Sequence, residues 1–271
     1  MQNRLYGMFA TLVCAAILLT GQAARGRHEA TIVLNTGARA QGVVRYLPAS
    51  RSYEITVRGE TREAIREVRA DEVAEVILAT PPPQLEQALR DVEQRRYQQA
   101  IPVLSRIVEE YAMFGPDRQA GVALMRAYLR TGRAGEALRA GESLLRRDPR
   151  LERRPEFATM YWESLLEEDR IPTLRTSIRE AIQSGSRDLV AVGLLRRGDL
   201  ETREGRHREA LVDGYLRVVL LFRDVGLVQP EALYKAMRAH EQLNEINYAE
   251  RWRQRLLAHH AASEFAQRLR E

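Results

Sequence analysis

The sequence contains one cysteine in 271 residues, which excludes several means of stabilisation and several kinds of chemistry. Cys14 lies within the first apolar stretch, so the rest of the chain can form neither a disulfide nor a thiolate metal site. Gly-rich phosphate loops and the Gly-x-Ser-x-Gly turn of serine hydrolases are also absent. The fold must therefore be stabilised by packing, and we expect no cofactor.

The five histidines do not form a recognisable metal motif. After His240-Glu241, Asn244 stands where a zinc-protease helix would carry its second histidine. His259 and His260 are neighbours, and on a helix they would point about 100° apart, so both cannot face one metal ion. The carboxylate runs are typical of solvated helix faces. We predict no metal site and no enzymatic activity.

Lysine is also scarce, because Lys235 is the sole lysine and nearly every cation is arginine. The net charge of +5 and the isoelectric point of about 9.6 would favour a nucleic-acid partner if the cations were clustered. They are instead scattered beside Asp and Glu along the chain. A general arginine bias is the interpretation we favour, and we predict no nucleic-acid binding.

The first residues have the pattern of a secretory signal. Arg4 precedes an apolar run at 8–19, and Gly21 and Ala23 supply small residues for cleavage after Ala23. Cys14 lies in the middle of the run, so lipid attachment is not expected. We predict a cleaved signal peptide at residues 1–23 and a periplasmic or otherwise exported protein, with outer-membrane association open. An uncleaved anchor is the alternative, although a bilayer span needs about 20 apolar residues.

Residues 28–79 have the period of two expected of β-strands. Tyr53, Ile55 and Val57 alternate with polar residues, which places them on one face of a strand. Further strands are predicted at 31–34, 42–47, 64–69 and 73–78, with a turn at Asn35-Thr36-Gly37 between the first two.

The order "TIVLNTGARAQGVVRYLPASRSYEITVRG…REVRADEVAEVIL" resembles the small five-stranded barrels of the Sm-like and SH3-like type. The resemblance implies a small barrel over residues 24–80 that serves as a structural or docking module. Some barrels of this type bind RNA, a function that we do not carry over to a chain expected to be exported. Pro81, Pro82 and Pro83 can continue neither a strand ladder nor a helix, so residues 81–83 are predicted to be a linker.

Residues 84–271 have a helical period and an internal repeat. Similar segments are centred on Ala100, Ala137, Leu174, Ala210 and Ala249, at steps of 37, 37, 36 and 39 residues. These segments resemble tetratricopeptide repeats, in which each unit is a helical hairpin. The last copy resembles repeats of periplasmic and outer-membrane envelope proteins. The third copy departs from the pattern, because it lacks both the turn glycine and the central alanine.

The copy "RAYLRTGRAGEALRAGESLLRRDP" matches the repeat pattern best. Gly132 can adopt the positive φ that ends a helix, Ala137 is small enough for two helices to touch, and Pro149 lacks the amide needed to continue. Pro102 and Pro172 are predicted in the first turns of second helices, where proline is tolerated. The resemblance implies a mainly α fold, a solenoid of about five hairpins, preceded by the small barrel.

In the resembling family, the first helix of each hairpin lines a concave groove that binds a peptide segment. Charged residues of the predicted first helices are therefore the candidates for binding a carboxylate-rich segment of another envelope protein. These partner-binding candidates are Arg126, Arg130, Arg196, Arg203, Lys235 and Arg238. Glu163 and Glu167 are predicted on the same surface and would divide it.

Three alternatives to the groove remain open. The cations can be an ordinary solubilising surface. The chain can be a structural component that assembles with copies of itself and has no separate groove. A nucleic-acid binder would follow if the first segment stayed uncleaved in the cytoplasm. Aromatic residues such as Tyr161, Trp162, Trp252 and Phe265 are predicted to pack between hairpins.

Overall fold

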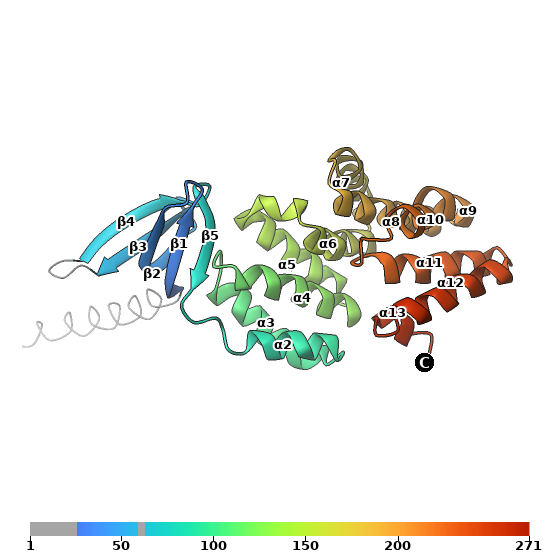
Figure 1. Ribbon diagram of the computed structural model, residues 1–271, viewed down its shortest axis with the longest axis horizontal. Helices are drawn as coiled ribbons and strands as arrows, with labels where there is room; N and C mark the ends of the chain where they lie inside the picture. The colour runs from blue at the N-terminus through green and yellow to red at the C-terminus, as the bar shows by residue number, and fades with distance from the viewer. Residues whose placement is uncertain (1–25, 59–62, 271) are drawn as a thin grey trace, which may run out of the picture. The chain divides into compact units, whose positions relative to one another are not determined.

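The computed structural model describes residues 26–58 and 63–270 (Figure 1). The predicted signal peptide lies outside the described residues. The chain divides into two compact units, Met1–Ala127 and Tyr128–Glu271, which we call unit 1 and unit 2. Unit 1 contains all the β-strands and the beginning of the helical part of the chain. The predicted linker at 81–83 lies within this unit, between the last strand and the helix that follows it.

The strands of unit 1 form one antiparallel sheet in the order β4-β3-β2-β1-β5. Their bounds are β1 Arg27–Leu34, β2 Arg39–Leu47, β3 Ser52–Arg58, β4 Glu63–Arg69 and β5 Val73–Leu78. All five strands were predicted at these places. Among the described residues no ladder joins β4 to β5, so the sheet is open at these two edges and closure into a barrel is not seen.

One face of the sheet is covered by a loop from the helical part of unit 1. Met113 and Phe114, from the loop between α3 (Tyr97–Glu110) and α4 (Pro116–Arg130), are buried in the core of the sheet. The Tyr53 hydroxyl donates a 2.5 Å hydrogen bond to the carbonyl oxygen of Met113. The strand residues of this core are Ala30, Ile32, Val44, Tyr53, Ile55 and Val73. The prediction that Tyr53, Ile55 and Val57 share one face is confirmed, with Tyr53 and Ile55 buried in this core and Val57 packed at its margin.

The helices follow one another in pairs, and each pair is a helical hairpin. The first helices are α2 Leu85–Glu93, α4 Pro116–Arg130, α6 Pro155–Glu167, α8 Arg187–Arg203 and α11 Gln229–Gln242. The second helices are α3 Tyr97–Glu110, α5 Ala134–Arg147, α7 Ile171–Gln183, a composite of α9 His207–Glu209, the π-helix η2 Ala210–Tyr215 and α10 Leu216–Leu221, and α12 Ile246–His259. A short 3-10 helix, η1 Pro149–Arg153, precedes α6, and α13 Glu264–Gln267 follows α12.

Every turn between the paired helices has the same backbone geometry. One residue of each turn has a positive φ, and these residues are Arg95, Gly132, Asp169, Gly205 and Asn244. The next residue donates its amide to a carbonyl five positions earlier, as in the bond from Arg133 to Tyr128. This is the Schellman ending of a helix. Glycine is favoured there, but only Gly132 and Gly205 supply it, so the repeat keeps the geometry where the glycine is lost.

The predicted repeat centres occupy equivalent places. Ala100, Ala137, Leu174, Ala210 and Ala249 are each the fourth residue of a second helix, and each is at most 4 % exposed. The predicted repeat phase is therefore confirmed. Pro172 lies in the first turn of α7, as predicted. The prediction for Pro102 was wrong by one turn, because α3 begins at Tyr97 and places Pro102 inside the helix.

A very close helix crossing in unit 2 lies between α8 and the π-helix. A Cβ on Gly214 would lie 2.5 Å from the Cα of Gly198, and a Cβ on Gly198 would lie 2.5 Å from the ring of Tyr215. Real Cβ atoms do not approach other atoms this closely, so both glycines are required by the crossing. The crossing directs the Tyr215 hydroxyl to Asp199, at 2.9 Å.

Candidate functional site

The first helices of unit 2 share a buried network of charges centred on Arg196 of α8. The Arg196 side chain is 0 % exposed. Its Nη1 lies 2.7 Å from Asp199 Oδ2 and 2.6 Å from Glu231 Oε1. Its Nη2 donates to the Thr159 carbonyl oxygen at 3.1 Å and lies 3.3 Å from Glu163 Oε2. A buried guanidinium needs such partners because its desolvation is costly.

The network continues to α4 through Glu163 of α6. The second carboxylate oxygen of Glu163 accepts a 2.6 Å hydrogen bond from Arg130 Nη1. Arg130 also donates two hydrogen bonds to Glu264 of α13, from Nε at 2.9 Å and from Nη2 at 2.6 Å. This is the bidentate arrangement that guanidinium and carboxylate groups favour. Glu163 thus joins two arginines, which corrects the prediction that it divides a basic surface.

On the other side of Arg196, the network reaches Lys235 of α11. Lys235 Nζ lies 2.6 Å from Asp199 Oδ1 and 2.7 Å from Glu231 Oε1. Asp199 also accepts a hydrogen bond from the Tyr215 hydroxyl. The network therefore connects five helices, α4, α6, α8, α11 and α13. We call Arg130, Glu163, Arg196, Asp199, Glu231, Lys235 and Glu264 the charge network.

The charges of the network shift one another's pKa strongly. Burial by itself would raise the pKa of Glu231, but the charges of Arg196 and Lys235 outweigh it and lower this pKa far below its ordinary value. Burial would lower the pKa of Arg196, yet Glu231 and Asp199 raise it well above its ordinary value. The pKa of Tyr215 is raised, first by burial and then by the charge of Asp199. The shifts of Glu231 and Arg196 both favour the charged form of the side chain.

The network partners are spaced by about one repeat. Arg130 and Glu163 are 33 residues apart, as are Glu163 and Arg196, and Arg196 and Glu231 are 35 apart. Adjacent first helices place residues one repeat apart side by side. Asp199, Glu231 and Glu264 were not predicted, although opposite charges at one repeat length would have indicated the first two.

Three of the predicted binding residues, Arg130, Arg196 and Lys235, belong to this network. Exposure of Arg196 was expected, and this was wrong, because its partners enclose it completely. Arg130 has a side chain only 9 % exposed, between Glu163 and Glu264. Lys235 is 25 % exposed and lies at the edge. Arg126 of α4 is half-buried in unit 1, and its Nε has no hydrogen-bond partner among the described residues. Binding of a partner by any of these residues remains a prediction.

The remaining two predicted residues line a cleft on unit 2. Arg203 and Arg238 face a cavity of about 470 Å³ beside the outer side of the network. The cleft is lined by residues of the first helices α6, α8 and α11, joined by His207 and Tyr215: Leu166, Glu167, Asp199, Thr202, Arg203, Tyr234, Lys235, Arg238, Ala239 and Gln242. The structure thus brings three of the six candidates, Arg203, Lys235 and Arg238, to one concave surface.

The two arginines of the cleft are held by carboxylates at the surface, one exposed and one partly exposed. Arg203 Nη2 lies 2.9 Å from Asp169 Oδ1, with side chains 45 % and 72 % exposed. Arg238 Nη1 lies 2.8 Å from Glu241 Oε2. Exposed ion pairs contribute little stability, about 0–1 kcal/mol. A carboxylate of another molecule can therefore replace Asp169 or Glu241 at small cost.

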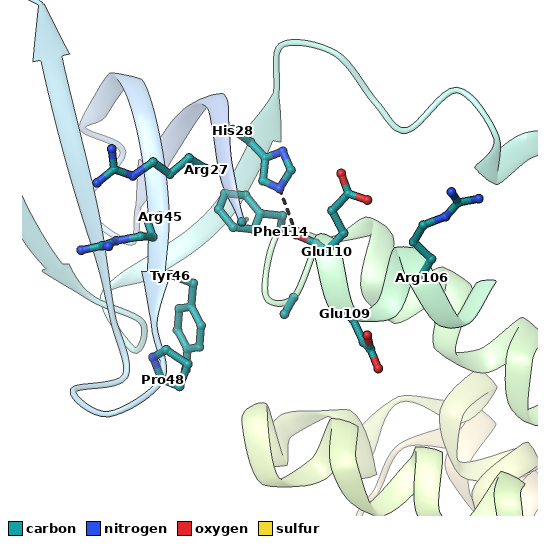
Figure 2. Close-up of a pocket in the computed structure, with 11 residues that line it drawn as sticks. Arg27, His28, Arg45, Tyr46, Pro48, Arg106, Glu109, Glu110 and Phe114 are labelled. Atoms are coloured by element: carbon teal, nitrogen blue, oxygen red, sulfur yellow. Dashed lines mark hydrogen bonds between the residues drawn. The ribbon is translucent and has the colours of Figure 1, made fainter. Parts of the chain in front are cut away.

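Unit 1 has a larger hollow, of about 710 Å³, between the sheet and the end of α3 (Figure 2). His28 Nε2 lies 3.0 Å from the Glu110 carbonyl oxygen and must donate this hydrogen bond, since a carbonyl only accepts. The His28 ring stacks on Tyr111 at 4.4 Å. Figure 2 shows the Arg27 and Arg45 side chains directed away from the glutamates of α3. The charged ends of the side chains labelled in Figure 2 do not converge on one point.

Two features of the described residues bear on other functions. Residues 26–58 and 63–270 contain no group of three or more His, Cys, Asp or Glu side chains placed to hold a metal ion. None of the helices in that same part of the chain is long and apolar enough to cross a bilayer. The absence of a metal and of a cofactor stays a prediction from the sequence.

No protein-family model and no curated protein matches the chain. Among solved structures, MamA (AMB-1) is similar at 14% sequence identity and a TM-score of 0.39, over 65% of this chain and 96% of that one. A Podosopora anserina putative kinesin light chain with nearly identical TPR-like repeats is similar at 15% identity and a TM-score of 0.43, over 65% and 92%. A second structure of that kinesin light chain has 16% identity and a TM-score of 0.44, over 68% and 95%.

Proposed function

We propose that this protein is a non-catalytic binding scaffold whose cleft receives a carboxylate-bearing segment of a partner protein. The observation that carries the proposal is the concave surface of α6, α8 and α11, where Arg203 and Arg238 are exposed at the rim. A surface that spans successive first helices is long enough to contact several residues of a bound segment.

The charges of the cleft favour an acidic partner. Asp199 is already neutralised by Arg196 and Lys235, so it does not repel an incoming carboxylate strongly. Arg203 and Arg238 can each form a bidentate pair with such a group. Tyr234 and Leu166 add apolar surface between them. Glu167, at the edge, favours a segment that is not uniformly acidic.

The proposal includes export to the periplasm, with the partner another envelope protein. The sequence of residues 1–23 supports this part, and sequencing the N-terminus of the mature protein tests it. The second candidate function is self-assembly of an envelope component without a separate ligand. It draws on the same concave surface, which a second copy could occupy.

Photo-crosslinking in cells tests the function. A photoreactive amino acid at Gln242, which lines the cleft and is exposed, should capture a partner protein. The Arg203→Glu/Arg238→Glu variant should reduce capture at least tenfold, since each substitution turns an attraction into a repulsion. These residues are preferred to Arg130, because Arg130 belongs to the charge network.

The matched control is Arg223→Glu/Arg253→Glu, which makes the same charge change at two exposed arginines outside the cleft. Its capture should stay within twofold of the unaltered chain. Equal capture by both variants would reject the cleft as the binding surface. If the only crosslinked product is the chain itself, and its mass depends on concentration, self-assembly replaces the scaffold proposal.

A further inference from the structure

The α13 segment is bound to the first helices of unit 2 as a separate ligand would be. Glu264 forms its bidentate pair with Arg130, 134 residues earlier in the chain. The Phe265 ring lies 5.8 Å from the ring of Tyr234 on α11. Ala266 of α13 is fully buried. One acid, one aromatic ring and one small side chain thus hold the segment.

The helix itself supplies little of the energy that keeps α13 in place. It is four residues long, and its start is capped by Ser263 Oγ, which accepts a 3.2 Å hydrogen bond from the Ala266 amide. Isolated helices of this length are not stable in water, because nucleation is costly. The segment is therefore ordered by its contacts with Arg130 and Tyr234, and it can detach without disrupting a longer element.

The place of α13 is continuous with the cleft. Tyr234 contacts Phe265 and also lines the cleft beside Lys235 and Arg238. We call Arg130 and Tyr234 the α13 seat. When α13 leaves, Arg130 keeps Glu163 but loses a bidentate partner, and the Tyr234 ring loses its cover. The Nε and Nη2 groups of Arg130, released from Glu264, and an uncovered aromatic ring are complementary to the same chemistry that α13 presents.

We propose that the α13 seat is a binding surface for a partner segment that presents a carboxylate and an aromatic ring within one helical turn, and that α13 is its internal competitor. The inference rests on the proposed function in that the segment belongs to a protein partner. It adds a second contact surface and a means of limiting access to it. An internal competitor has a high effective concentration, so it lowers the apparent affinity of the partner.

A labelled synthetic peptide tests the inference on the full chain. The probe is Ala-Ala-Ser-Glu-Phe-Ala-Gln-Arg-Leu-Arg, the sequence of residues 261–270, and its binding is followed by fluorescence anisotropy. The Glu264→Arg/Phe265→Ala chain should bind it at least tenfold more tightly than the unaltered chain, because its own α13 no longer competes. The matched control Tyr248→Ala/Glu250→Arg changes an exposed aromatic and an exposed acid on α12, and it should bind like the unaltered chain.

Variants of the probe distinguish specific binding at the α13 seat from nonspecific binding, without any change to the protein. Replacing Glu264 of the peptide by Gln, or its Phe265 by Ala, should weaken binding at least tenfold. If the double variant of the protein does not fold by circular dichroism, the milder Glu264→Gln chain takes its place. Two results would overturn the inference and make α13 a structural cap: equal binding of all the peptides, or no binding of the probe to a folded chain that carries the substitutions in α13.

The outcome also separates this inference from the proposed function. A chain that captures a partner through Arg203 and Arg238 but does not bind the probe keeps the proposed function and loses the seat. A chain that binds the probe but captures no partner keeps the seat and loses the scaffold function.

Discussion

The centres of the two units are built from different chemistry. In unit 1, Met113 and Phe114 cover one face of the sheet, and the core there is made of apolar and aromatic side chains. In unit 2, the first helices meet around Arg196, a fully buried charge with three carboxylates around it. Apolar contacts tolerate small shifts, whereas a buried ion pair holds only when its partners are placed within hydrogen-bond distance. Unit 2 therefore has the more directional centre.

Two buried carboxylates show the same contrast. Asp117 of unit 1 is 2 % exposed and accepts hydrogen bonds from the amides of Met113 and Gly115, and burial raises its pKa. Glu231 of unit 2 is 4 % exposed, and the charges beside it lower its pKa. Equal burial thus has opposite results, because only Glu231 lies between two cations.

Removing the central charge should have the largest effect. Arg196→Leu leaves Glu231, Asp199 and Glu163 short of a buried partner, and we expect a loss of about 3–5 kcal/mol in the free energy of unfolding of unit 2. Both tryptophans, Trp162 and Trp252, lie in unit 2, so denaturant unfolding followed by tryptophan fluorescence measures it. The control Arg197→Leu changes the neighbouring arginine, which is partly exposed, and should cost less than about 0.5 kcal/mol. Equal losses would show that the network is not the centre of unit 2.

Truncating the apolar centre of unit 1 should cost about as much or somewhat less. Phe114→Ala removes a ring that is 1 % exposed and lies between Tyr53 and His28. We expect it to lower the free energy of unfolding of the sheet by about 3–5 kcal/mol. Hydrogen exchange of the strand amides measures the loss. Phe222→Ala, at a half-buried ring in unit 2, should leave that exchange unchanged. A sheet that exchanges normally without Phe114 would show that the loop does not support it.

Acid should affect the two units in opposite directions, with a smaller effect than either substitution. Because the pKa of Glu231 is lowered, its stabilising contribution is complete above its unfolded value of about 4.3 and is lost as the pH falls below it. Because the pKa of Asp117 is raised, its buried charge destabilises folded unit 1. This destabilisation decreases as the pH falls toward the folded pKa of Asp117.

The pH experiment compares tryptophan-detected unfolding of unit 2 with strand exchange in unit 1 from pH 7 down to about pH 3. We expect unit 2 to weaken as the pH falls below about 4.3, and the acid sensitivity to diminish in Glu231→Gln. The raised pKa of Lys235 predicts a second decline of unit 2 as the pH rises above about 10.4. Parallel acid sensitivity of both units would contradict the assigned roles of the two carboxylates.

Much of the fold could be predicted because its signals are local. The five strands follow from alternation, and the repeat phase follows from Ala100, Ala137 and their equivalents, since a helix crossing needs a small side chain where the backbones meet. The insertion of Met113 and Phe114 into the sheet was not predicted. Its cause is a contact between distant segments, for which neither residue carries a periodic signal.

The candidate site was predicted only in part, for a related reason. Arg203 and Arg238 were correctly placed on first helices and remain exposed. Arg196 has the same residue type and a similar position, yet it is enclosed because Asp199, Glu231 and Glu163 all reach it. A sequence shows that a charge lies on a helix face, but burial depends on what the neighbouring helices place opposite it.

The amino-acid sequence by itself determined where the helices turn, because a positive φ and a small buried residue are demands of the local backbone, as Gly132 and Ala137 illustrate. Tertiary structure alone decided which charges pair. Arg130 meets Glu163 one repeat later and Glu264 of α13, and the physical reason is that buried ions persist only where packing brings opposite charges within reach.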